Sequence, residues 1–94
     1  MSVFFSPEAD VDFANAIEYL AERNRNAATA LGHRIFAVLD KLARGDFEGP
    51  QVTLRAGDVV RSWPVPPLRI YYERRGDGLW VVRLHHQARP SIVR

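Results

Sequence analysis

The chain has 94 residues, a formal net charge of +2, a hydrophobic content of 47% and no cysteine. This length suits one domain with a thin core. The lack of cysteine excludes a disulfide framework and a thiolate nucleophile or metal ligand. No stretch has the pattern of a signal peptide or the length of a membrane span. We therefore expect one cytoplasmic domain over residues 1–94.

The two halves of the chain carry opposite net charge. Residues 1–50 contain five Lys or Arg and eight Asp or Glu (net −3), whereas residues 51–94 contain eight Arg and three Asp or Glu (net +5). A GC-rich genome would favour Arg over Lys throughout, but it does not explain this asymmetry. Because Arg has a planar, permanently charged fork that suits phosphate and carboxylate groups, the second half indicates an anionic partner.

The first half predicts a short strand at residues 3–5 and two helices. Ser6 and Pro7 are a favourable N-cap and first helical residue. Apolar residues then recur at helical spacing to about residue 23. We expect Asn26 to cap a second helix that ends at Gly45. The short connection makes the two helices antiparallel neighbours in an αα-hairpin.

The second half predicts three antiparallel strands at residues 59–63, 68–73 and 79–85, with a hairpin turn at 76–78. Residues 46–57 are expected to form a loop, because they contain Gly49-Pro50 and Gly57-Asp58. The prolines at 64, 66 and 67 favour a bend, a bulge or a sheet edge. This order predicts an α+β fold with the helix pair packed on one face of the sheet.

Alternation along the strands predicts which side chains share a face of the sheet. One side, against the helices, should carry Leu68, Ile70, Tyr72, Trp80, Val82 and Leu84. The other, uncovered side should gather a basic and aromatic set, with Val81 beside it: Arg61, Arg69, Tyr71, Arg83 and His85. A β-bulge would reverse the assignment beyond it.

Four stretches, taken in order, carry a resemblance to a known family: FSPEA at 5–9, GDVVRSWPV at 57–65, LRIYY at 68–72 and VVRLHHQAR at 81–89. A basic strand start, an RIxY-like strand, a turn and a VxRxxHxxR end resemble the RelE/ParE toxin superfamily. The ParE branch, often called plasmid stabilisation proteins, is the nearer match.

The resemblance implies a toxin of a type II toxin–antitoxin system, neutralised by a cognate antitoxin that is ParD-like with a ribbon-helix-helix domain. ParE-like members inhibit DNA gyrase, and gyrase inhibition that blocks replication is our first hypothesis. RelE-like members cut mRNA in the ribosomal A site, with the RNA 2′-OH as nucleophile and cations that stabilise the phosphate. A ribosome-dependent mRNA interferase is therefore the alternative. A non-toxic relic that only binds antitoxin is the second alternative.

Candidate residues follow for each hypothesis. Target contacts are expected from Arg61, Arg69, Tyr71, Arg83, His85 and Arg89. A ribonuclease would use Arg61, Arg83, His85 and His86 for catalysis. Antitoxin contacts are expected from four aromatic residues, because an antitoxin helix would dock in an apolar groove: Tyr19, Phe36, Phe47 and Trp63.

We expect no cofactor and no metal site. His85 and His86 are adjacent in a strand, so their rings should point to opposite faces. The single lysine, Lys41, and the modest net charge favour gyrase inhibition over docking on ribosomal RNA, since RNA affinity depends on phosphate neutralisation.

Overall fold

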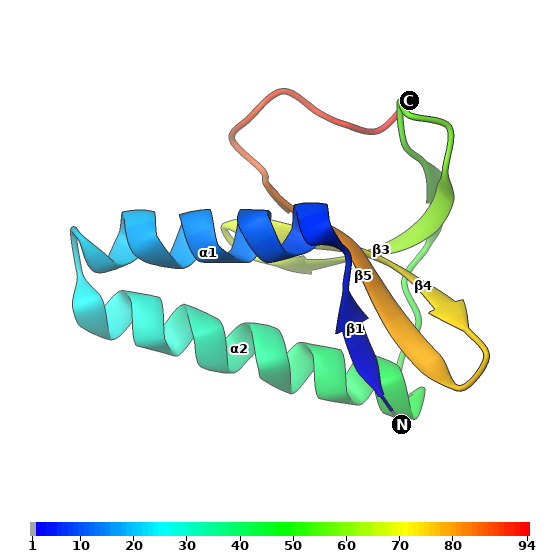
Figure 1. The fold of residues 1–94 in the computed structure, drawn as a ribbon, viewed down its shortest axis with the longest axis horizontal. Coiled ribbons are helices and arrows are strands. Elements are labelled where there is room, and N and C mark those ends of the chain that lie inside the picture. The colour runs from blue at the N-terminus through cyan, green and yellow to red at the C-terminus, as the bar shows by residue number, and fades with distance from the viewer. Residues whose placement is uncertain (1) are drawn as a thin grey trace.

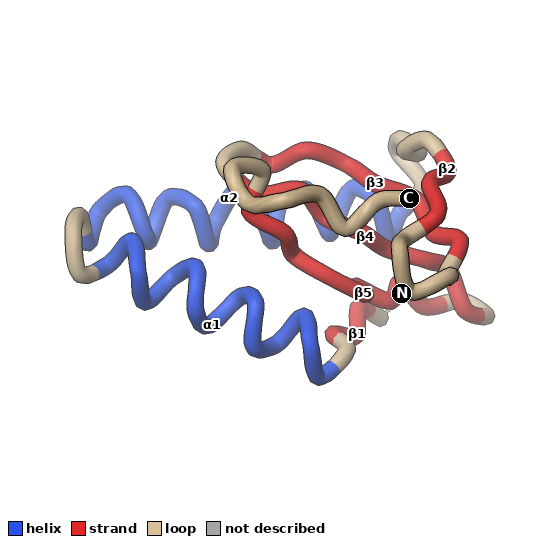
Figure 2. The backbone as a smooth tube through the Cα atoms, turned by 90° about the horizontal axis from the view of Figure 1, so that it is seen from above, coloured by secondary structure: helices blue, strands red, loops and turns tan. Residues whose placement is uncertain are grey.

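The computed structural model describes residues 2–94, which form two helices beside a five-stranded sheet (Figure 1). The elements in chain order are β1 (Val3–Phe5), α1 (Pro7–Ala21), α2 (Arg25–Arg44), β2 (Gln51–Thr53), β3 (Val59–Val65), β4 (Leu68–Arg75) and β5 (Gly78–His86). Figure 2 shows α2 behind the sheet and α1 beside the edge near β1 and β5. Both helices contribute to the same buried core, and the predicted α+β class is confirmed. Neither helix within residues 2–94 has the length and apolar character that a bilayer span requires.

Capping residues define the ends of both helices. The Ser6 hydroxyl accepts a hydrogen bond from the Ala9 N–H at 3.0 Å, and Pro7 opens α1 as predicted. The N-cap of α2 is Asn24, whose side chain accepts from the Ala27 N–H at 3.0 Å, so the prediction of Asn26 is wrong. The reason is that α1 ends at Ala21, two residues earlier than expected, which releases Asn24 to serve as the cap.

The sheet has the strand order β1-β5-β4-β3-β2 and is mixed. The predicted antiparallel pairing of β3, β4 and β5 is confirmed, and β1 adds to β5 in the parallel direction. β2 falls in residues 46–57, which the sequence predicted as loop, and pairs with β3. β2 was not predicted because it directly follows the turn residues Gly49-Pro50, and its three residues are too few to show an alternating pattern.

Pro64 lies near the end of β3, and Pro66 and Pro67 follow in the turn to β4. These positions suit residues that donate no backbone hydrogen bond. Pro64 faces Arg69 of β4, but β2 pairs with β3 only from Val59 to Arg61. β3 is therefore an edge of the described sheet at Pro64, where a missing donor costs little. The turn into β4 contains a cis peptide bond between Pro66 and Pro67.

A β-bulge in β5 changes which of its residues face the helices. Arg83 lies opposite Tyr71 and Val81 opposite Tyr72, which leaves Val82 as the extra residue. An inserted residue shifts the pleat by one position, so strict alternation fails here. Leu79, Val81 and Leu84 belong to the buried core on the helix side, although Val81 was predicted on the other face. Trp80 and Val82 were predicted to face the helices and do not belong to this core.

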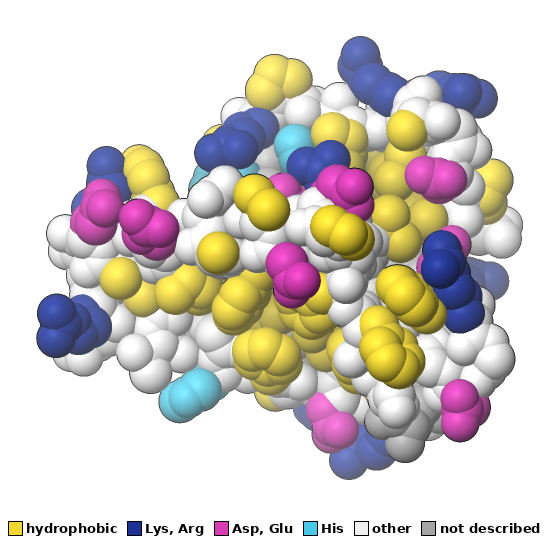
Figure 3. Space-filling model, in the orientation of Figure 1, with side chains coloured by type: hydrophobic (Ala, Val, Ile, Leu, Met, Phe, Trp, Pro, Cys, Tyr) yellow, Lys and Arg dark blue, Asp and Glu magenta, His cyan; other side chains and the backbone are white. Residues whose placement is uncertain are grey.

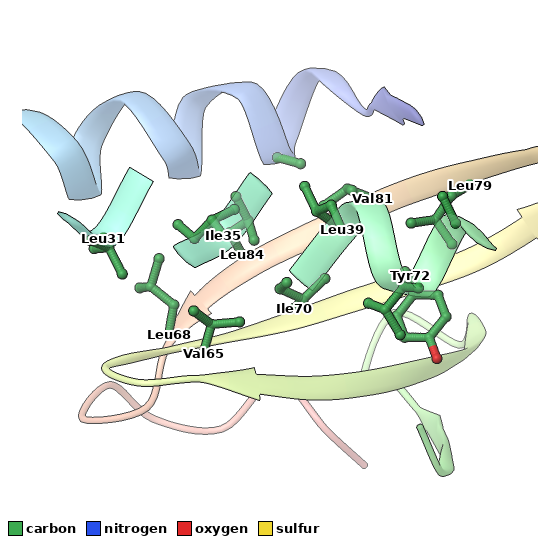
Figure 4. Packing of buried hydrophobic residues seen from close by; sticks show 13 residues of the cluster. Leu31, Ile35, Leu39, Val65, Leu68, Ile70, Tyr72, Leu79, Val81 and Leu84 are labelled. Atoms are coloured by element: carbon green, nitrogen blue, oxygen red, sulfur yellow. The ribbon is translucent and has the colours of Figure 1, made fainter. Parts of the chain in front are cut away.

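The main core lies between the helices and the sheet (Figure 4). The three predicted β4 residues, Leu68, Ile70 and Tyr72, are all at most 1% exposed. They pack against the apolar stripe of α2: Leu31, Ile35, Leu39 and Leu42. The helix-facing side of β4 is thus as the period of two predicted.

A second apolar cluster lies on the opposite face of the sheet. Leu54, Val60 and Tyr71 are buried there, with partly buried neighbours that include Ile92 and Val93. The C-terminal segment, red in Figure 1, leaves β5 and returns beside the chain that follows β2. The Arg94 N–H donates to the Thr53 carbonyl at 2.7 Å, and Val93 bridges Leu54. The face expected to be uncovered is therefore partly covered by the chain's own C-terminal segment.

Gly49 lies where two backbone segments touch. A methyl group at this position would lie 1.8 Å from the Ser62 carbonyl oxygen. The Gly49 N–H donates to the Tyr72 hydroxyl at 2.8 Å, and its carbonyl accepts from Arg61 Nη1 at 2.7 Å. Gly49 therefore joins the segment before β2 to both β3 and β4.

We predict that Gly49→Ala lowers the free energy of unfolding by about 3 kcal/mol, because a backbone carbonyl cannot rotate away from the added methyl group. For a domain of this size the melting temperature should fall by roughly 12–20 °C. Gly32→Ala is the matched control: its methyl group would lie 3.9 Å from Ile17 Cδ1. Inside a helix this change should stabilise by about 0.5–1 kcal/mol. Thermal melts followed by circular dichroism test both signs, and an unchanged Gly49→Ala melt would contradict the prediction.

Candidate functional site

A cleft of about 380 Å³ lies between α1 and the C-terminal end of β5. Its floor is apolar and includes Ala16, Leu20, Leu31, Leu68 and Leu84. Its rim is polar and is formed by Asp12, Asn15 and Tyr19 of α1, by Arg83, His85 and His86 of β5, and by Arg89. Figure 3 shows Arg and His side chains gathered on the side of α1 that faces away from α2. We call this site the α1/β5 cleft.

The cleft brings together five residues that the sequence predicted for three different roles. Arg83, His85 and Arg89 were expected at the target, His86 in catalysis and Tyr19 at the antitoxin; all five line it. The bulge in β5 contributes to this arrangement, because it shifts the pleat just before Arg83.

An ion pair between Asp12 and Arg83 links α1 to β5 at the edge of the cleft. Arg83 Nε donates to Asp12 Oδ2 at 2.7 Å and Nη2 donates to Oδ1 at 3.1 Å. The Leu84 N–H also donates to Oδ2, at 3.0 Å. The hydrogen bonds to Asp12 raise the pKa of Arg83, against the opposing effect of burial. The charge of Arg83 is therefore already compensated within the protein.

Sequence reasoning did not identify Asp12, although a signal was present. Acidic residues near a helix N-terminus are favoured by the helix dipole, so the position of Asp12 alone does not mark it as unusual. Asp12, however, follows buried Ala9 by three residues and precedes Ala16 by four, so it lies on the face of α1 that packs inward. A carboxylate on an inward face indicates a buried partner.

The two histidines hold the turn that follows β5. His85 Nε2 donates to the Pro90 carbonyl oxygen at 2.9 Å, since a carbonyl can only accept. His86 Nδ1 accepts from the Ala88 N–H at 3.1 Å. The Arg89 N–H also donates to the His86 carbonyl at 3.1 Å. These bonds place Arg89 at the end of the cleft.

Arg61 lies away from the cleft, in a separate polar network. Arg61 and Trp63 lie on the side of β3 that faces the helices, and Trp63 packs against the main core. Arg61 was predicted on the opposite face with Arg69, and this prediction is wrong. Its Nη1 donates to Gly49, and its Nε lies 3.8 Å from Glu48 Oε2. Arg61 and Arg69 are separated because they sit at positions of opposite parity in paired strands.

Glu48 is the centre of that network. Arg74 Nη2 donates to Glu48 Oε1 at 3.1 Å, and the Tyr72 hydroxyl donates to the same atom at 2.9 Å. The hydrogen bond from Arg74 lowers the pKa of Glu48, with burial acting in the opposite direction. Arg61 therefore faces a carboxylate that stays charged at neutral pH.

Arg69 and Tyr71 lie on the face opposite the helices, as predicted, but only Arg69 is accessible there. Arg69 is paired with His85 across β4 and β5 and donates to the Ser62 hydroxyl at 3.0 Å. Tyr71 is 4% exposed beneath the C-terminal segment, and burial raises the pKa of its hydroxyl. Tyr71 therefore supports this face from inside.

The four aromatic residues predicted for the antitoxin lie in three places. Phe36 is 53% exposed and lines a hollow of about 340 Å³ between α1 and α2. We call this hollow the hairpin groove; it also includes Phe13 and Ile17, and Figure 3 shows hydrophobic surface along it. Tyr19 lies on the cleft side of α1. Phe47 and Trp63 stack on each other 4.2 Å apart, partly buried against the main core.

The comparisons with known proteins agree with this fold. A family model described as the ParE toxin of type II toxin–antitoxin systems matches residues 3–90. A solved structure described as the chromosomal ParDE TA system from P. aeruginosa is similar, with a TM-score of 0.68 and 16% identity. That match covers 92% of this chain and 95% of the other. No curated protein matches the chain.

We predict that Asp12→Ala lowers the free energy of unfolding by about 2 kcal/mol, because two charged hydrogen bonds and the bond to Leu84 lose their acceptor. Arg83→Ala should cost about 1 kcal/mol, since Asp12 keeps its bond to Leu84. The exposed neighbour Asp10 is the control, and Asp10→Ala should change stability by less than about 0.5 kcal/mol. Urea unfolding of the single and double variants gives the coupling energy. A coupling of zero would show that the ion pair contributes nothing.

The lowered pKa of Glu48 predicts a loss of stability in acid. A carboxyl group whose pKa is lower in the folded state stabilises the fold above its unfolded pKa, and this contribution is lost as the pH falls through the folded value. The loss should therefore begin below about pH 4. Glu48→Gln should flatten this part of the stability curve, and Glu22→Gln, on the surface, should not. The midpoint of urea unfolding, measured between about pH 2.5 and 6, gives the stability curve of the parent and of each variant. If the curves of the parent and Glu48→Gln run parallel, Glu48 does not cause the loss of stability in acid.

Proposed function

This chain belongs to the family of ParE toxins of type II toxin–antitoxin systems, and we propose that it blocks DNA gyrase by binding it through the α1/β5 cleft, without cutting a substrate. Family membership also makes an antitoxin its partner. Gyrase acts in the cytoplasm, and we place the protein there.

One observation carries the proposal: three residues expected at the target, Arg83, His85 and Arg89, line a single hollow with an apolar floor. Hollows of this kind bind a side chain of a partner protein, because the floor gains from apolar burial and the rim supplies orienting hydrogen bonds. Arg69 does not line the hollow, but it lies opposite His85 in the paired strands β4 and β5. A protein target therefore fits this surface.

The arrangement of charges supports binding over phosphate chemistry. A ribonuclease of the RelE type would need several cations around one phosphate. Arg61, however, is bound to Gly49 and lies beside Glu48, away from the cleft, and Arg83 is paired with Asp12. Of the four residues expected in catalysis, Arg83, His85 and His86 remain together. We therefore rank the mRNA interferase below the gyrase inhibitor.

We assign the antitoxin, which we expect to be ParD-like, to the hairpin groove. Phe36 is half exposed there beside Phe13, with ring centroids 5.5 Å apart. Exposed aromatic side chains in an apolar groove between two helices suit the apolar face of a third helix. Contacts of Phe47 and Trp63 with the antitoxin stay a prediction.

We predict that Arg89→Ala raises the toxin concentration for half-inhibition of gyrase supercoiling about tenfold, as expected when one interface arginine is lost. The melting temperature should stay within about 2 °C, because Arg89 is exposed. Arg55→Ala, at an exposed arginine outside the cleft, is the matched control and should inhibit like the parent. A supercoiling assay with purified gyrase gives the values.

Toxin expression in cells separates the alternatives. Plasmid topoisomers and primer extension on a cellular mRNA are followed together after induction. Relaxed or linear plasmid with intact mRNA is the expected result. Codon-phased mRNA cleavage with unchanged topoisomers would replace gyrase inhibition by the interferase hypothesis, and normal growth would favour the non-toxic relic.

A further inference from the structure

β1 is an edge strand whose outer side pairs with no other strand within residues 2–94. It stands at one end of the strand order and pairs only with β5; Figure 2 shows it at the margin of the sheet. The Ser2 carbonyl accepts a hydrogen bond from β5, and the Ser6 N–H donates to β5. Because backbone groups alternate in direction along a strand, the backbone of Phe4 also faces β5. The N–H and C=O groups of Val3 and Phe5 therefore point to the outer side.

Phe4 places an exposed aromatic side chain at this free edge. Phe5 packs against the main core, so the preceding residue, Phe4, points to the face opposite the helices. Phe4 is 46% exposed and stacks on Trp80, with the ring centroids 5.3 Å apart. The position of the ring depends on Gly78, where a methyl group would lie 3.1 Å from Phe4 Cε2. The edge thus combines free backbone groups with an ordered apolar contact surface.

We propose that β1 pairs with β1 of a second copy of this chain, in the antiparallel direction and with the two Phe4 residues opposite each other. In this register Val3 of each copy lies opposite Phe5 of the other, and their outward N–H and C=O groups form hydrogen-bonded pairs. The two five-stranded sheets then form one continuous sheet across a two-fold axis. This self-association does not depend on which target the α1/β5 cleft binds.

The spacing of residues in β1 favours a second copy as the partner. A two-fold axis at Phe4 sets each outward residue opposite another outward residue, so the strand is complementary to itself. Phe4 then forms a non-hydrogen-bonded pair with its counterpart, and in such pairs the side chains approach most closely. Trp80 flanks Phe4 in each copy, so the rings of both copies form one aromatic row on the face opposite the helices.

The charges near this row permit the contact. β1 contains neither a charged residue nor a proline, which commonly protect an exposed edge from pairing. The guanidinium carbon of Arg75 lies 4.5 Å from the ring centroid of Trp80, and Glu73 forms an ion pair with Arg75. The positive charge at each end of the row is therefore compensated within its own copy.

Sedimentation velocity of the free toxin, at concentrations from about 5 to 500 µM, measures the self-association. β1 has only three residues, so the contact is small and we expect a dissociation constant of roughly 10–100 µM. Phe4→Asp should weaken association by about tenfold or more, because it sets two carboxylates opposite each other. Val59→Asp is the matched control, at an apolar strand residue that is 57% exposed and lies in β3. It should change association by less than about twofold, and circular dichroism melts check that both variants fold.

A single cysteine provides a second measurement. The chain contains no cysteine, so Phe4→Cys places one thiol per copy at the two-fold axis. Facing Cα atoms about 4.5 Å apart suit a disulfide, and mild oxidation should link the two copies. Val3→Cys is the control. Its two thiols lie diagonally across the axis, with Cα atoms more than about 7 Å apart, and should not form a disulfide.

Three outcomes would contradict the second copy. A monomer at every concentration, with no cross-link from Phe4→Cys, would overturn the proposal. Equal self-association of the parent and Phe4→Asp would place the contact on another surface and would also overturn it. If the toxin stays monomeric and Phe4→Asp weakens antitoxin binding, the edge of β1 receives the antitoxin in place of a second copy.

Discussion

The carboxylate of Asp12 completes the edge of β5, and the position of α1 depends on it. β1 pairs with β5 only as far as Phe5 opposite Val81. Beyond that point Ser6 takes over, because its N–H donates to the Val81 carbonyl and its hydroxyl to the Val82 carbonyl. Asp12 then accepts from the Leu84 N–H and pairs with Arg83. A helix therefore satisfies the polar groups that a longer β1 would otherwise have paired.

This constraint also shapes the functional surface. Because α1 is held along the edge of β5, the cleft opens between them and the hairpin groove opens on the other flank. The same ion pair compensates the charge of Arg83 before any partner arrives. A compensated arginine contributes direction and hydrogen bonds more than net charge, which suits recognition of a protein better than stabilisation of a phosphate.

Sequence patterns predicted the elements well wherever the signal was local. Ser6-Pro7 and Gly45 mark helix ends, and the alternation of Leu68, Ile70 and Tyr72 assigned β4 correctly. The predictions failed where pairing between strands decided the outcome. The bulge at Val82 placed Val81 on the side of the sheet opposite to the predicted one. Pairing with β3 made residues 51–53 a strand, although they follow a turn signal. Both depend on how two strands pair, which the pattern within a single strand does not show.

The sequence by itself determined the helix hairpin, the three long strands, the helix-facing side of β4 and the family resemblance, because periodicity, caps and motif order are properties of the chain. Only the tertiary structure decided which charged residues meet. Arg83 joined Asp12 across 71 positions, Arg61 joined the network of Glu48, and Tyr71 was buried under the C-terminal segment. Pairings of this kind have no local signature, since they depend on the packing of whole elements and on the exact register of the sheet.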